Sequence, residues 1–143
     1  MSGPPVSNIH GTAVALDATR GVLILGPSGA GKSLLALRLM ALGARLVADD
    51  RVDLWAEGAE VWARAPEALS GMIEARGVGL LGAAALPAAR IALVVDLGRE
   101  EPERLPPQRK HDLLGRSVPL VLRVQHGHLD AAVLQWLKGG RVA

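Results

Sequence analysis

The chain has 143 residues, half of them hydrophobic and 21% charged, which is the size and composition of one ordinary folded domain. It contains no cysteine, which excludes disulfides, thiolate metal sites and cysteine nucleophiles. Phe and Tyr are absent, and sixteen basic residues against fourteen acidic ones leave a net charge of only +2. Nucleic acid is therefore not an expected partner, because such proteins use aromatic stacking platforms or a basic stripe.

The sequence shows no membrane span and no signal peptide. Its longest apolar stretches, such as residues 91–97, have the length of a strand and are interrupted by charged residues. Residues 1–10 have neither the cationic nor the apolar region of a leader peptide. We therefore expect a cytoplasmic protein without membrane contact. One domain is expected over residues 1–143, beginning with a short flexible segment over residues 1–9.

The predicted elements alternate between strands and occasional helices. In chain order they are strands at 12–16 and 22–25, a helix at 32–42, strands at 45–48, 52–55 and 60–63, a helical turn at 66–69, apolar segments at 72–75 and 78–81, strands at 91–96 and 118–124, and a helix at 129–137. Residues 99–116 are charged and contain proline, which is typical of a mobile lid or docking loop. Because hairpins outnumber crossovers, we predict an α/β fold with a mixed sheet.

A glycine-rich loop follows the second predicted strand and precedes the first predicted helix. It satisfies the pattern G-x4-G-K-[ST] of a P-loop, or Walker A motif, and about 0.002 such matches are expected by chance in this composition. Its backbone N–H groups surround phosphates, aided by the helix N-terminus. The predicted nucleotide-binding residues are Gly26, Pro27, Ser28, Gly29, Ala30, Gly31, Lys32 and Ser33.

In this loop, Lys32 is expected to reach the β- and γ-phosphates of ATP and the Ser33 hydroxyl to ligate Mg²⁺. The alternative is a glycine turn that only joins a strand to a helix. The sequence context of strand, loop and leucine-rich helix favours the nucleotide site.

Asp49 and Asp50 stand side by side after the predicted strand at residues 45–48. One carboxylate of such a pair can lie near a metal while the other takes a proton from an attacking hydroxyl. Side chains alternate along a strand, so both can face one site only if the chain turns there. The alternative is a solvent-exposed turn in which Asp50 pairs with Arg51.

Four separated pieces of the sequence, with a weaker fifth, resemble the HPr kinase/phosphorylase family. They are His10-Gly11, the P-loop, Arg-Leu-Val-Ala-Asp-Asp at 45–50, Ile-Glu-Ala-Arg-Gly-Val-Gly at 73–79, and the weaker Glu-Arg-Leu at 103–105. That family phosphorylates a serine of HPr, the phosphocarrier protein of the sugar phosphotransferase system. The resemblance implies a P-loop kinase domain with a mixed β-sheet, similar to HPr kinase and PEP carboxykinase. It points to the family's C-terminal catalytic domain in a truncated, single-domain form.

The resemblance also implies a role for each matched residue. The catalytic residues are Asp50, Lys32, His10 and Arg104, and the metal ligands are Ser33, Glu74 and Asp49. Asp50 would accept the proton of the substrate serine, with Asp49 beside the metal. His10 would lie against the phosphates, and Arg104 would stabilise the phosphoryl group in transit. ATP and Mg²⁺ are the implied cofactors.

Several of these residues have a plain structural alternative. His10 could be a solvent-exposed residue near a terminus. Glu74 could pair with Arg76 across a turn, and Arg104 could be one charge of an exposed lid.

The chain departs from the family in a late segment. Where the family has a proline- and arginine-rich loop tied to phosphorolysis, residues 117–123 read Ser-Val-Pro-Leu-Val-Leu-Arg. We therefore expect an ATP-dependent serine kinase acting on HPr or a related carrier, with a weak phosphorylase activity. A small-molecule P-loop kinase and a non-catalytic ATP-sensing module stay open as alternatives. The carrier's identity and a homo-oligomeric state are also open at this stage.

Overall fold

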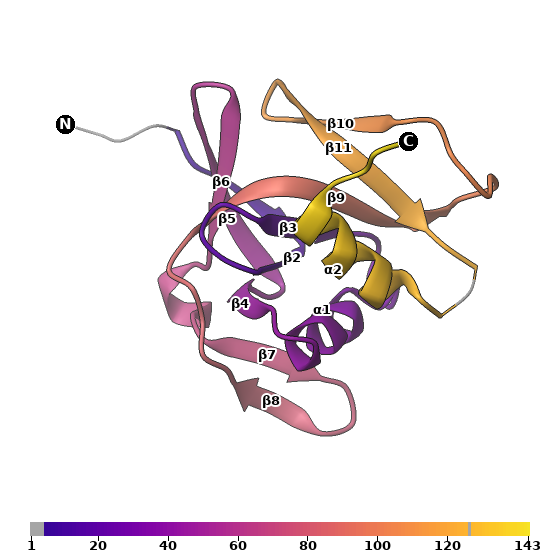
Figure 1. Ribbon diagram of the computed structural model, residues 1–143. Coiled ribbons are helices and arrows are strands. Elements are labelled where there is room, and N and C mark those ends of the chain that lie inside the picture. Colours follow the sequence, from indigo (N-terminus) through magenta and orange to yellow (C-terminus); the bar gives the residue numbers. More distant parts are fainter. Residues whose placement is uncertain (1–4, 126) are drawn as a thin grey trace.

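The computed structural model describes residues 5–125 and 127–143. The elements, drawn in Figure 1, are β1 (Ser7–His10), β2 (Thr12–Ala15), β3 (Gly21–Leu25), α1 (Lys32–Ala41), β4 (Arg45–Ala48), β5 (Arg51–Glu57), β6 (Glu60–Arg64), the 3₁₀ turn η1 (Glu67–Leu69), β7 (Met72–Ala75), β8 (Gly79–Gly82), β9 (Ala89–Glu100), β10 (Arg109–Leu113), β11 (Arg116–Arg123) and α2 (Leu129–Gly139). Neither of the two α-helices in the described residues is long and apolar enough to cross a membrane.

The main sheet is mixed, as predicted, and β9 lies at its centre. β9 pairs in parallel with β3 and with β11, and its first residues pair antiparallel with β6. The sheet order is β1-β5-β6-β9-β3-β2-β4, and β10 is attached through β11. The middle of β9 is mostly buried, which explains its nearly continuous apolar sequence.

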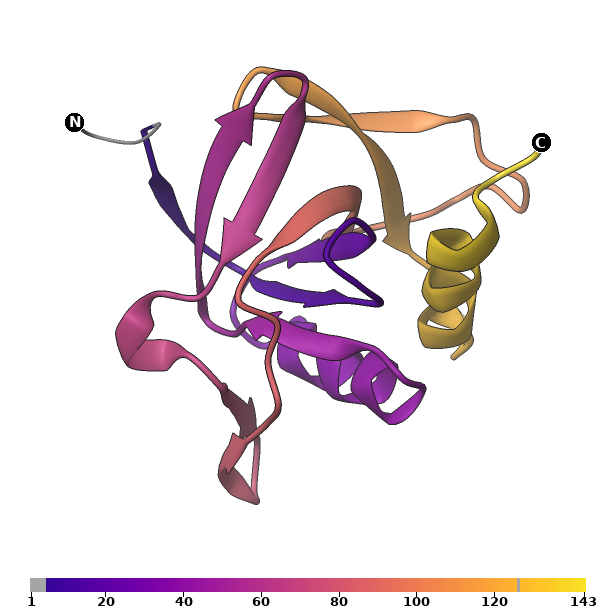
Figure 2. The same cartoon turned by 60° about the vertical axis from the view of Figure 1, so that its left-hand side comes forward.

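Alternating side chains along β3 separate two cores. Val22 and Ile24 belong to the core with Leu39 of α1 and Leu134 of α2. Leu23, between them in sequence, faces the other core, which the curled part of the sheet encloses. Figure 2 shows α1 below the strands and the β5–β6 and β10–β11 hairpins above them. The P-loop helix is thereby held against one face of the sheet.

β7 and β8 form a separate two-stranded sheet that extends away from the main one (Figure 1, bottom). Ile73 on β7 is 1% exposed and joins the core beneath α1, which holds the hairpin in place. Beyond it, Val78 and Leu80 are 76% and 65% exposed. The hairpin therefore has an anchored base and a solvent-exposed apolar end.

The mobile lid or docking loop predicted over residues 99–116 is wrong at its two ends, because only residues 101–108 connect β9 to β10 without regular secondary structure. β9 continues to Glu100, and β10 and β11 form an antiparallel hairpin. Between β9 and β10, the carboxylate of Glu101 is buried and accepts two hydrogen bonds from the Arg109 guanidinium, at 2.7 and 2.8 Å. A buried charge needs a partner, and this bidentate pair fastens the connection to β10. Sequence reasoning missed it because both residues stand in one charged run.

The flexible N-terminal segment predicted for residues 1–9 is wrong for residues 7–9. They belong to β1, which pairs antiparallel with β5. Residues 1–4 of the predicted segment lie outside the described residues. Asn8 Nδ2 also donates to Asp53 Oδ1 at 2.8 Å across this pair of strands. The pairing brings His10 opposite Arg51 and so next to Asp50.

Candidate active site

The P-loop joins the buried strand β3 to α1. Gly26 has a φ of 153°, and a Cβ there would meet the Cβ atoms of Ala30 and Leu97 at 3.1 and 3.3 Å. Gly31 has a φ of 97° directly before the first residue of α1. Glycine alone adopts such backbone angles without strain. The loop geometry thus requires these two glycines of the motif.

Lys32 is buried at the start of α1, with 7% of its surface exposed. Its ammonium group donates to the carbonyl oxygens of Gly26 and Pro27, at 2.8 and 3.1 Å. These contacts fold the side chain back along the loop. The positive charge is therefore held beside the backbone N–H groups that suit phosphate oxygens.

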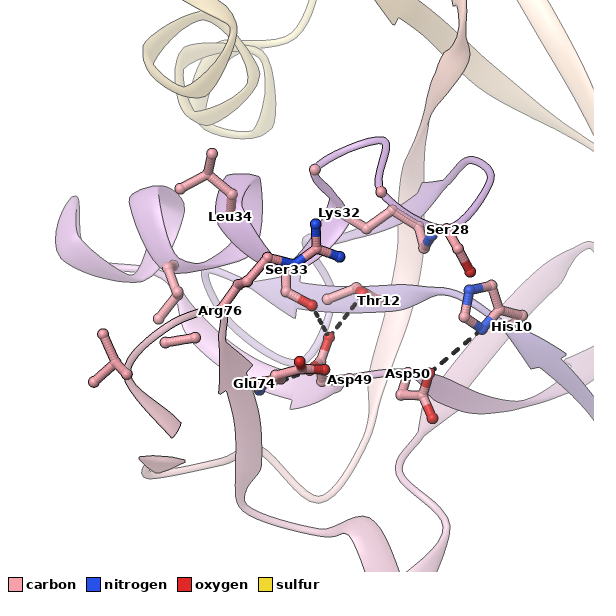
Figure 3. A pocket seen from close by; sticks show the side chains of 15 residues that line it. His10, Thr12, Ser28, Lys32, Ser33, Leu34, Asp49, Asp50, Glu74 and Arg76 are labelled. Atoms are coloured by element: carbon pink, nitrogen blue, oxygen red, sulfur yellow. Dashed lines mark hydrogen bonds and ion pairs between the residues drawn. The ribbon is translucent and has the colours of Figure 1, made fainter. Parts of the chain in front are cut away.

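Asp49 connects three parts of the site, as Figure 3 shows. Its Oδ1 accepts hydrogen bonds from the Ser33 hydroxyl at 2.7 Å and the Thr12 hydroxyl at 2.9 Å. Its Oδ2 accepts one from the backbone N–H of Glu74 at 3.0 Å. Asp49 is 5% exposed, so these bonds satisfy most of a buried carboxylate. The P-loop, β2 and the β7–β8 hairpin are thereby joined at one side chain.

Asp50 points away from Asp49 because the chain turns at this residue. Its φ is 69°, and the Arg51 N–H donates to the Asp49 carbonyl at 2.8 Å, which closes a one-residue turn. Positive φ is uncommon outside glycine, and aspartate is among the residues that tolerate it best. The turn aims the Asp50 carboxylate at His10 Nδ1, 3.5 Å away (Figure 3). In the described residues the side-chain contact of Asp50 is thus with the His10 imidazole, and no ion pair joins it to Arg51.

A cleft of about 580 Å³ lies between the P-loop, the Asp49-Asp50 turn and the β7–β8 hairpin. The predicted site residues that line it are His10, Ser28, Gly29, Gly31, Lys32, Ser33, Asp49, Asp50 and Glu74. Residues of the β7–β8 hairpin and of α1 also line it, among them Arg76, Val78 and Leu34. No ion pair joins Glu74 to Arg76 in the described part of the chain. The residues predicted from four separate motifs therefore share one cleft.

One predicted catalytic residue, Arg104, lies outside this cleft. It sits in the connection between β9 and β10 and does not line the cavity. A different arginine reaches the P-loop: Arg123 Nη2 donates to the Ala30 carbonyl at 3.0 Å. A bulge between Leu122 and Arg123 interrupts the pairing with β9 at that point. Arg123 lies in the late segment that departs from the family pattern.

Thr12 is the residue of this cleft that sequence reasoning missed. It is 1% exposed, and its hydroxyl donates to Asp49. The available signal was a hydroxyl at the first position of an otherwise apolar strand, two residues after His10.

The oxygen atoms around the cleft suit a magnesium ion. Ser33 supplies a hydroxyl, and Asp49 and Glu74 supply carboxylates, which are hard ligands. In the described residues no three His, Cys, Asp or Glu side chains form a group that could hold a metal alone. Mg²⁺ is commonly held by one or two carboxylates together with substrate phosphates and water. This donor set therefore fits Mg²⁺ that binds together with a nucleotide.

Comparison with known proteins agrees with this geometry. Residues 4–134 match the family model described as HPr Serine kinase C-terminal domain. The chain belongs to this family. The predicted family resemblance is therefore confirmed, and so is the α/β fold with a mixed sheet.

Individual members of the HPr kinase family show how far the similarity extends. The chain is 40% identical over 119 residues to the HPr kinase/phosphorylase of Geobacillus thermodenitrificans, covering 78% of this chain and 37% of that protein. It is 34% identical over 147 residues to HPr kinase/phosphorylase 1 of Oceanobacillus iheyensis, covering 97% of this chain and 45% of that protein. The chain thus spans less than half the length of these relatives.

A solved structure, the Hpr(Ser) kinase/phosphatase from Coxiella burnetii, has a similar fold. It superposes with a TM-score of 0.76 at 27% sequence identity, covering 92% of this chain and 94% of that chain. The similarity in fold therefore extends over most of both chains.

Proposed function

We propose that the protein is an ATP-dependent serine kinase that acts on HPr or a related phosphocarrier protein of the phosphotransferase system. The observation that carries this proposal is the exposure of Asp50, whose side chain is 67% accessible at the mouth of the P-loop cleft. A general base must come within hydrogen-bond reach of the proton it removes. A serine on the surface of a folded protein can approach Asp50, whereas Asp49 is 5% exposed and already accepts three hydrogen bonds.

The residues of the cleft divide the work of phosphoryl transfer between them. Lys32 and the loop N–H groups bind the phosphates of ATP, and Ser33, Asp49 and Glu74 hold Mg²⁺, which neutralises phosphate charge when bound. Asp50 takes the proton from the serine Oγ as that oxygen bonds to the γ-phosphorus. The bond from phosphorus to the bridging oxygen breaks, and ADP leaves. His10, 3.5 Å from Asp50, orients its carboxylate.

We infer that phosphorolysis is the weaker of the two activities. The inference is supported by residues 117–123, which depart from the family's late loop and keep one arginine, Arg123. For Arg104, only the sequence motif supports the proposed role of stabilising the phosphoryl group, because this residue does not line the cleft. We also propose a cytoplasmic location, because the proposed reaction consumes ATP, and homo-oligomerisation stays a proposal.

Incubation with γ-labelled ATP, Mg²⁺ and purified HPr-like carriers tests the proposal. The expected result is label on one serine of a carrier, stable to the treatments that cleave phosphohistidine. Label on a metabolite instead would identify a small-molecule kinase. Binding of ATP without transfer to any acceptor would identify an ATP-sensing module.

A further inference from the structure

Thr12 places a hydroxyl group inside an otherwise apolar part of the sheet. It is the first residue of β2, which lies between β3 and β4, and it is 1% exposed. Its neighbours in β2, Ala13 and Val14, are fully buried and apolar. Because a buried hydroxyl without a partner destabilises a protein, Thr12 must use its one donor, and it does so on Asp49.

The hydrogen bonds to Asp49 limit how this carboxylate can turn. An ionised carboxylate offers about four acceptor positions on its two oxygens. Thr12 and Ser33 occupy Oδ1, at 2.9 and 2.7 Å, and the Glu74 N–H occupies one position of Oδ2, at 3.0 Å. One position on Oδ2 is therefore left for a metal ion or a water bound to it. Without the Thr12 hydroxyl, Oδ1 would keep a single donor and the carboxylate could rotate about its bond to Cβ.

We propose that Thr12 is a positioning residue for the phosphoryl-transfer site. Its hydroxyl locks the Asp49 carboxylate in the one orientation that accepts from the Ser33 hydroxyl and from the Glu74 amide together. That orientation sets the spacing between the P-loop serine and the strand that carries Glu74. The proposal rests on the proposed function for its effect on Mg²⁺ and ATP, but its structural part, the restraint on Asp49, does not.

The chain supplies a matched control for this proposal. Thr19, its only other threonine, also donates its hydroxyl to an aspartate, Asp17 Oδ1 at 3.1 Å. That pair lies in the turn between β2 and β3 and does not line the cleft. Thr12→Val removes the hydroxyl and keeps the branched shape, Thr12→Ser keeps the hydroxyl, and Thr19→Val removes a hydroxyl–aspartate bond elsewhere.

The first measurement is the Mg²⁺ concentration needed for half-maximal binding of a fluorescent ATP analogue. Hydrogen bonds to charged groups are among the stronger ones, so Thr12→Val should raise this concentration by roughly tenfold or more. Thr12→Ser should stay within about threefold of wild type, and Thr19→Val should match it. Equal weakening by Thr12→Val and Thr12→Ser would show that the methyl packing matters and not the hydroxyl, and would overturn the proposal.

The second measurement needs no nucleotide. Hydrogen exchange of the Glu74 amide, followed by NMR in the metal-free protein, reports whether Asp49 still holds it. Thr12→Val should increase that exchange rate while Thr12→Ser and Thr19→Val leave it unchanged. If neither wild-type protein nor any variant binds the ATP analogue, the proposed function fails. The exchange rate of the Glu74 amide then still tests whether Thr12 restrains the Asp49 carboxylate. If Thr12→Val leaves the exchange rate of the Glu74 amide unchanged, the proposed role of Thr12 is overturned, whatever the result of the nucleotide titration.

Discussion

Ser33 Oγ lies 2.7 Å from Asp49 Oδ1, and this hydrogen bond joins the P-loop to the strand end that carries both acidic residues. The two residues are sixteen positions apart in sequence. They meet because α1 returns along the sheet to β4, which places the start of the helix beside the end of the strand. The one-residue turn at Asp50 then directs the second carboxylate toward the mouth of the same cleft.

Asp50→Asn tests the assignment of the general base. Asparagine tolerates the positive φ of 69° at this position, so the backbone turn should survive. We expect transfer to the carrier to fall by roughly 10²–10⁴, the usual range for loss of a general base, and ATP·Mg²⁺ affinity to stay within a few-fold. Titration with a fluorescent ATP analogue, run beside the transfer assay, measures both. If Asp50→Asn loses both ATP binding and transfer, Asp50 belongs to the metal site and is not the general base.

Asp49→Asn should act on magnesium and on stability. The amide places N–H donors where hydroxyl or backbone donors already point, so at least one buried hydrogen bond is lost. We expect a free-energy loss of about 1–3 kcal/mol in urea unfolding and a higher Mg²⁺ requirement for ATP binding. Asp112→Asn serves as the control, because Asp112 is an exposed residue near the end of β10 whose carboxylate accepts a hydrogen bond from the Gly115 N–H. If Asp49→Asn needs no more Mg²⁺ for ATP binding than wild type does, Asp49 is not part of the metal site.

Lys32→Ala should abolish transfer because it removes the positive charge of the P-loop. The lysine is buried and bonded to two loop carbonyls, so a moderate fall in melting temperature should accompany the loss of activity. Lys138→Ala, in the exposed last turn of α2, should change neither quantity. Thermal denaturation and the transfer assay together check this prediction. An active Lys32→Ala protein would contradict the nucleotide-site assignment.

Arg123 tests whether the late segment supports the P-loop. Its guanidinium holds the Ala30 carbonyl of the P-loop at 3.0 Å. We expect Arg123→Ala to lower the affinity for ATP by several-fold. The affinity of Arg123→Lys should lie between those of wild type and Arg123→Ala, because a guanidinium spans this contact better than an ammonium.

Incubating phosphorylated carrier with inorganic phosphate and following pyrophosphate measures the reverse reaction. Wild-type pyrophosphate release as fast as forward transfer would show that the late segment does not limit phosphorolysis.

The pair formed by the buried Glu101 and the half-buried Arg109 predicts how stability depends on pH. The Arg109 guanidinium, by its hydrogen bonds, holds the pKa of Glu101 below its usual 4.5. A carboxylate with a lowered folded-state pKa stabilises the fold fully above its unfolded pKa, and loses that contribution as the pH falls through the folded value. Urea unfolding should therefore show Glu101→Gln less stable than wild type at pH 7, with the difference shrinking below pH 4.5. A difference independent of pH would contradict an ionic contribution.

Most of the fold and of the site could be predicted from local patterns in the sequence. The P-loop was readable because glycine spacing, a preceding apolar strand and a following leucine-rich helix are all local signals. The strands β3, β4 and β9 and the hairpin of β5 and β6 also follow from local alternation and turn residues.

Features that depend on contacts between distant residues could not be predicted in this way. Glu101 and Arg109 belong to one charged run, and the sequence alone does not distinguish a buried bidentate pair from solvated charges. The hydrogen bond from Thr12 to Asp49 spans 37 positions and depends on β2 lying between β3 and β4. Strand order is a property of the assembled sheet, so the hydroxyl at the start of an apolar strand was a signal that could not identify Asp49 as its partner.

Mass spectrometry of a purified HPr-like carrier, after incubation with ATP, Mg²⁺ and either wild-type protein or Asp50→Asn, tests the central claim most directly. We expect wild-type protein to add one phosphate to a single serine of the carrier. We expect Asp50→Asn to leave the carrier almost unmodified while it still binds ATP. A carrier that stays unmodified with wild-type protein, or one modified equally well by Asp50→Asn, would contradict it.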